Sequence, residues 1–103
     1  MSPIQRLQAE LARLPGVSHG LSRFGSRERI AWSIDGREFA HLHADDLLDL
    51  RLPRSIQRRL RNDPRAHFRR GSSEWLEFEF HTIEDVEQLG ALAREAFAAA
   101  KAK

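Results

Sequence analysis

The pair Asp35-Gly36 constrains this chain more than any other feature of its sequence. Apolar residues occupy every second position from 30 to 34, directly before the pair. Such a period of two residues is typical of a half-buried strand, and Asp-Gly favours the tight turn between antiparallel strands. The partner strand is then residues 37–43. The chain is therefore predicted to contain an antiparallel sheet.

Helix signals lie at both ends of the chain. Ser2 and Gln5 form a capping-box pattern before a helix that ends near Leu14, and Thr82 and Asp85 form a similar pair before a closing helix. The buried face of the closing helix is predicted to be Val86, Leu89, Ala93, Phe97 and Ala100.

Further strands are predicted at residues 17–24, 48–52, 66–70 and 75–80, and a short helix at 53–62. The order is α-β-β-β-β-α-β-β-α. This order predicts an α+β fold, in which an antiparallel sheet of about five to six strands packs against the N-terminal and the C-terminal helix. In the strand at 30–34, Trp32 is predicted to belong to the core.

The length of 103 residues predicts one domain over residues 1–103, with a frayed tail at about 98–103. The chain has no cysteine, which excludes disulfides and thiolate metal sites. No apolar run approaches the roughly 20 residues that span a bilayer, and the first residues lack the layout of a signal peptide. We therefore expect a soluble, cytoplasmic protein without membrane partners.

The charge is segregated along the chain, although the net charge is only +2. Residues 51–70 contain eight arginines and one aspartate, whereas residues 71–103 contain three cations and seven acidic residues. The basic segment has two interpretations. It can pair with the acidic strand and helix that follow it, or it can attract a polyanion.

Several short motifs between residues 14 and 97 form a recognisable pattern. They are Leu14-Pro15-Gly16-Val17, Arg23-Phe24-Gly25, Gly36-Arg37-Glu38, His41-Leu42-His43, Asp49-Leu50-Arg51-Leu52-Pro53-Arg54, His67, Trp75, Phe78 and Glu84-Asp85-Val86. Together they resemble the small bacterial luciferase-domain proteins, which are similar to the core of fungal luciferase. The chain departs from that pattern at one position, because it has Ser73-Glu74-Trp75 where the family commonly has Ser-Gly-Trp. A weaker likeness, carried by residues 15–17, 24–25 and the closing helix, is to the bacterial double-wing DNA-binding family.

The luciferase resemblance implies a fold more than a reaction. Fungal luciferases oxidise a hydroxylated pyrone with molecular oxygen and emit light, whereas the stand-alone bacterial members are mostly of unassigned function. We therefore predict neither a cofactor nor an enzyme class, because a fold is shared by proteins with different chemistry.

The sequence His41-Leu42-His43 carries the main candidate for chemistry. Two residues apart on a strand, the two rings point to the same face, with Phe39 beside them. Such a pair can pass a proton, hold an enolate-like substrate or share a metal, and His67 is a candidate third member. No third metal ligand is evident, so no metal site is predicted. The structural alternative is that both histidines bond to neighbours such as Asp45 or Asp49.

Other residues are candidates for binding an acidic ligand. Trp75 shares a strand face with acidic residues and is a candidate pocket wall, and Asp49 is near the histidines. Arg51 and Arg54 flank Pro53 at the start of a helix, where an anion can be bound. The leading prediction is thus a small-ligand-binding domain, its ligand an aromatic acid, with oxidative or proton-transfer chemistry at His41, His43 and His67 as an option.

Two alternatives to this function stay open. The first is a nucleic-acid-binding module that uses the helix at 53–62, with Arg54, Arg58, Arg61 and Arg65 as contacts. Its binding would follow shape or charge, because the helix lacks the mix of residues that reads bases directly. The second is an interaction domain that forms a homodimer through a sheet edge or the alanine-rich last helix.

Overall fold

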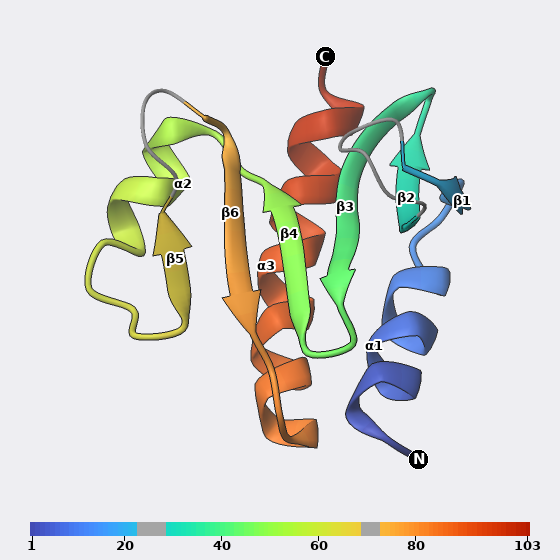
Figure 1. Cartoon of the computed structure of the whole chain (residues 1–103). Helices are drawn as coiled ribbons and strands as arrows, with labels where there is room; N and C mark the ends of the chain where they lie inside the picture. Colours follow the sequence, from blue (N-terminus) through green and yellow to red (C-terminus); the bar gives the residue numbers. More distant parts are fainter. Residues whose placement is uncertain (23–28, 69–72) are drawn as a thin grey trace.

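A computed structural model describes residues 1–22, 29–68 and 73–103 of the chain (Figure 1). In chain order its elements are α1 (Pro3–Ala12), β1 (Ser18–Leu21), β2 (Ile30–Ile34), β3 (Arg37–Ala44), β4 (Leu47–Arg51), α2 (Arg54–Arg59), β5 (Ala66–Phe68), β6 (Trp75–Glu79) and α3 (Ile83–Lys101). The end of the first predicted strand, at 23–24, and the end of the fifth, at 69–70, lie outside the described residues.

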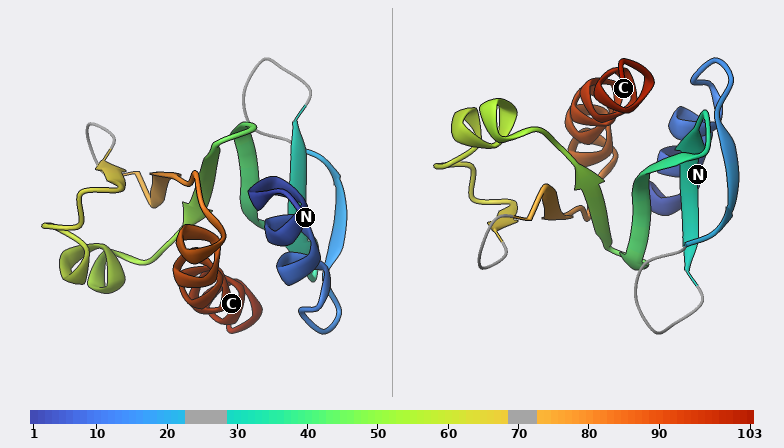
Figure 2. Two further views of the ribbon diagram at one scale, coloured as in Figure 1. Left: turned by 90° about the horizontal axis from the view of Figure 1, so that it is seen from below. Right: turned by 90° about the horizontal axis from the view of Figure 1, so that it is seen from above.

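The six strands form one antiparallel sheet in the order β1-β2-β3-β4-β6-β5. Helices α1 and α3 both lie against one face of this sheet, as the two views of Figure 2 show. The opposite face, turned toward the viewer in Figure 1, carries neither helix. The predicted α+β class and element order are confirmed. None of the helices in the described residues is both long and apolar enough to cross a membrane.

The local signals at the turn and at the helix ends act as predicted. Asp35 and Gly36 have φ angles of 52° and 76°, the left-handed pair that joins two antiparallel strands tightly. Ser2 caps α1 and Thr82 caps α3, each with a complete capping box. Short-range chemistry therefore fixes these boundaries.

The core fills the space between the sheet and the two long helices. Trp32 is 3% exposed, and all five predicted residues of the α3 face are buried. Helix α3 continues to Lys101, through most of the predicted tail. The alanines of its inner face pack in the core, whereas Ala91 and Ala98 on its outer face are exposed, so the helix and the sheet edge both stay candidates for the predicted homodimer.

A bulge in β3 changes which residues share a face. Trp32 pairs with Ala40 and Ser33 pairs with Glu38, so Phe39 is an extra residue with no partner in β2. The Phe39 ring instead packs edge-on against Phe97 of α3, with 5.7 Å between the ring centroids. The prediction that Phe39 lies beside the histidines is wrong, because simple alternation fails at the bulge.

Candidate functional site

His41 of β3 lies between two carboxylates on the sheet face without helices. Its Nδ1 is 3.0 Å from Glu38 Oε2 and its Nε2 is 2.7 Å from Asp49 Oδ2. His41 is 4% exposed, Glu38 6% and Asp49 0%, so this group is shielded from water. Each ring nitrogen of His41 therefore faces one carboxylate oxygen. Ser22 Oγ donates a further bond of 2.7 Å to Glu38 Oε2.

The bulge at Phe39 brings Glu38 to this group. In a regular strand, residues three apart point to opposite faces. The extra residue shifts the alternation by one position, so Glu38 and His41 face the same way and make their contact. Asp49 arrives from β4, where it pairs directly with His41.

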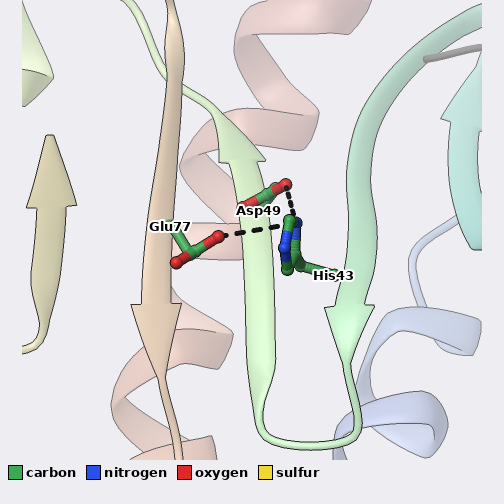
Figure 3. A group of neighbouring side chains, drawn as sticks. All are labelled: His43, Asp49 and Glu77. Atoms are coloured by element: carbon green, nitrogen blue, oxygen red, sulfur yellow. Dashed lines mark ion pairs between the residues drawn. The ribbon is translucent and has the colours of Figure 1, made fainter. Parts of the chain in front are cut away.

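His43 occupies the outer edge of the same group. Its side chain is 37% exposed, and its Nδ1 lies 3.7 Å from Asp49 Oδ2 and 3.5 Å from Glu77 Oε2. Figure 3 shows these three side chains meeting over β4, with α3 behind the strands. Arg29 Nη1 is 2.8 Å from the same Nδ1. Because a guanidinium only donates, Nδ1 of His43 is the acceptor in this contact.

Trp75 of β6 forms one wall of the group. Its ring centroid is 4.6 Å from that of His41, at an interplanar angle of 44°. Trp75 pairs with Arg51 on β4, in the same register that pairs Glu77 with Asp49. The histidines, the carboxylates and an aromatic wall therefore meet on one face of β3, β4 and β6.

His43, Asp49 and Glu77 together offer the donor set of a metal site. One ligand atom from each lies within 4.8 Å of the other two. Imidazole and carboxylate donors suit zinc and iron. The guanidinium of Arg29, however, already places a positive charge at the Nδ1 donor of His43. The guanidinium of Arg29 thus occupies the side of His43 Nδ1 where a metal ion would bind.

The remaining candidates for a small-ligand site lie elsewhere. Arg51 Nε forms a 3.2 Å ion pair with Glu74, beside a cavity of about 20 Å³, which holds roughly one water. Glu74, the departure from the family pattern, thus neutralises Arg51. Arg54 belongs to α2 and lines a separate groove.

His67 lies on the edge strand β5. It pairs in register with Glu77, but its Nε2 forms a 2.9 Å contact with Glu79. Hydrogen bonds from His81 and then from His67 hold the pKa of Glu79 below its ordinary value. Two strands, β4 and β6, separate β5 from β3, so His67 is not brought to His41.

The predicted nucleic-acid contacts divide into two groups. Arg54, Arg58 and Arg61 gather around one groove of about 650 Å³, together with Phe68. Arg65 instead lies 3.5 Å from Asp63 and 3.6 Å from Asp85. The internal-pairing interpretation of the basic segment therefore holds for Arg65, as it does for Arg51 and Arg59, while three arginines remain together at the groove.

Three residues of the group were missed from the sequence: Glu38, Glu77 and Arg29. Glu38 and Arg29 depend on the bulge, which no local pattern announces. In a two-residue hairpin without a bulge, Ile30 would pair with His41. In the structure the bulge shifts the register by one residue, and Ala31 pairs with His41. Glu77 had a usable signal, because it alternates with the core residues of its strand on the same face as Trp75.

Comparison with known proteins gives one family. The family model described as the Luciferase domain matches residues 36–96, which is more than half of the chain. The matched segment contains His41, His43, Asp49 and Trp75. Neither the comparison with curated proteins nor that with solved structures gave a match. The chain therefore belongs to the luciferase-domain family.

Proposed function

We propose that this protein binds a small aromatic acid on the helix-free face of its sheet and that His43 takes a proton from it. The observation that supports this most is the arrangement of His43, half-exposed, at the edge of the buried Glu38–His41–Asp49 group. Trp75 offers a flat wall for an aromatic ring. The oxidative option and the role predicted for His67 stay predictions.

Arg29 is the anchor for the acidic group in this proposal. Its guanidinium can bind a carboxylate with two parallel hydrogen bonds, which is stronger than its single bond to a neutral imidazole. Arg29 replaces Arg51 and Arg54 as the residue proposed to bind the acidic group of the ligand. Arg51 is paired with Glu74, and Arg54 lies on α2, away from the histidines. Binding of the ligand thereby frees Nδ1 of His43.

The proton transfer then follows from the charges around His43. A phenolic or enolic O–H of the ligand breaks, and its proton forms an N–H bond at the freed Nδ1. The imidazolium that results lies between Asp49 and Glu77, whose carboxylates are 3.7 and 3.5 Å from that nitrogen. Both anions stabilise the charge that His43 gains.

Fluorescence and absorbance titrations test this proposal. The probes are 4-hydroxybenzoate and a 4-hydroxy-2-pyrone carboxylate, each of which changes its ultraviolet spectrum when its hydroxyl loses a proton. We expect binding to quench Trp75, and Trp75→Phe to remove that signal. Arg29→Ala should weaken binding, whereas His43→Gln should keep binding and lose the spectral shift.

The matched control is His19→Gln, which changes an exposed histidine on the edge strand β1. It should leave both readouts unchanged. Failure of both probes to bind at millimolar concentration, or an unchanged spectral shift in His43→Gln, would refute the proposal. Oxygen uptake, recorded in the same titration, tests the oxidative option.

A further inference from the structure

The groove between α2 and β5 differs in chemistry from the histidine group and lies apart from it. Arg54, Arg58 and Arg61 line it from the α2 side, and Phe68 lines it from the edge strand. Phe68 pairs with Leu76, a buried residue on the sheet face that packs against the helices. The groove is therefore on the other face of the sheet from His43. Figure 2 shows that α2, which contributes to the groove, lies on the same side of the sheet as α3.

The arginines of this groove are available for an outside partner. Their neighbours are paired: Arg51 with Glu74, Arg59 with Glu95, and Arg65 with Asp63 and Asp85. Within residues 1–22, 29–68 and 73–103, by contrast, no carboxylate forms an ion pair with Arg54, Arg58 or Arg61. Arg54 and Arg58 are one helical turn apart, about 6 Å along the axis.

The groove also has a fixed floor and an aromatic side. Gln57 is 8% exposed, and its Nε2 donates to the carbonyl oxygens of Leu52 at 2.9 Å and Ser73 at 3.1 Å. These two bonds hold α2 at the edge of the sheet. Phe68 is 47% exposed and lines the groove, so its ring is accessible to a ligand there.

From this combination we propose that the groove binds single-stranded nucleic acid without sequence preference. Guanidinium groups bind phosphates with paired hydrogen bonds, and an exposed aromatic ring provides a surface on which a base stacks. The volume of about 650 Å³ is in the range of sites that enclose a small ligand, enough for a base and its phosphates. An acidic peptide would use the arginines but would have no use for the aromatic ring.

Fluorescence anisotropy with labelled dT12 and U12 oligonucleotides at about 50 mM salt tests the proposal. We expect the logarithm of the association constant to fall linearly with the logarithm of the salt concentration. The slope is about −0.7 per phosphate contact, and so about −2 for three arginines. Arg58→Ala should reduce that slope by about 0.7. Arg59→Ala is the matched control, because this arginine is on the same helix but pairs with Glu95.

The aromatic contact has a test of its own. Phe68→Ala should weaken oligonucleotide binding by about 5- to 150-fold, the range for the loss of one stacked base. Phe68→Trp, which keeps an aromatic ring, should bind about as well as the natural chain. His43→Ala should leave oligonucleotide binding unchanged, which keeps this proposal separate from the proton-transfer site. Circular dichroism of each variant confirms that the fold is retained.

Three results would overturn the proposal. The first is no binding of either oligonucleotide at low salt. The second is equal loss of affinity in Arg59→Ala and Arg58→Ala, which would indicate general charge attraction. The third is binding of a polyglutamate peptide or of anionic lipid vesicles with the same affinity and with no effect of Phe68→Ala, which would assign the groove to another partner.

Discussion

Removal of the His41 side chain should destabilise this domain far more than removal of the neighbouring His43. In His41→Ala, Glu38 and Asp49 lose the group between them, although they are only 6% and 0% exposed. Removing one member of a buried, charged hydrogen-bonded group costs about 3–5 kcal/mol, because the remaining charge stays buried without its partner. The domain as a whole has a stability of about 5–15 kcal/mol, so this loss is a large part of it.

His43→Ala provides the comparison within the same strand. The side chain of His43 is 37% exposed, and contacts of such exposed ionic groups contribute about 0–1 kcal/mol. Urea unfolding at pH 7, followed by far-ultraviolet circular dichroism, measures both variants. Tryptophan fluorescence is less suitable, since Trp75 lies against the ring that is removed.

A double-mutant cycle then tests the cause of the loss. His41→Ala with Asp49→Ala should cost less than the sum of the single changes, with a coupling of about 0.5–3 kcal/mol. A cost below about 1 kcal/mol for His41→Ala, equal to that of His43→Ala, would refute the reasoning. It would mean that water reaches both carboxylates when the ring is gone.

Four further predictions follow from single features of the structure. The backbone N–H groups of His81 and then Thr82 bond to Asp85 and hold its pKa below the ordinary value near 3.9. Asp85→Ala should therefore lower stability by about 1 kcal/mol at pH 7, and thermal melts should show this difference shrink as the pH falls through the lowered pKa. Arg29→Ala removes the cation at His43, so zinc should raise the melting temperature of this variant and not of the natural protein; an equal rise in both would contradict the role given to the guanidinium. Gly36→Ala meets no atom within 4 Å but must keep a φ of 76°, so it should cost about 1–2 kcal/mol in a urea titration, and a neutral effect would be inconsistent with the turn. The four exposed residues of β1 form one edge of the sheet, where the predicted homodimer could assemble, and a constant monomer mass in size-exclusion chromatography at two concentrations would reject that dimer.

Local sequence patterns determined most of the fold. The turn at Asp35 and Gly36 follows from the conformations that these two residues adopt easily, and the helix starts at Ser2 and Thr82 follow from capping within one turn. Alternation along β6 and the apolar face of α3 gave the core. Each of these signals acts between residues fewer than about five positions apart, so the sequence carries it without help from the rest of the chain.

The candidate site was only partly predictable. His41, His43, Asp49 and Trp75 were found because they lie in the family pattern and on the correct strand faces. Their partners come from pairing between strands, and a shift of one residue reverses the face of every side chain that follows. The sequence thus determined the elements, the core and the two histidines. Only the tertiary structure decided that one histidine is buried between two carboxylates while the other meets an arginine, because the bulge and the strand order depend on contacts between distant segments.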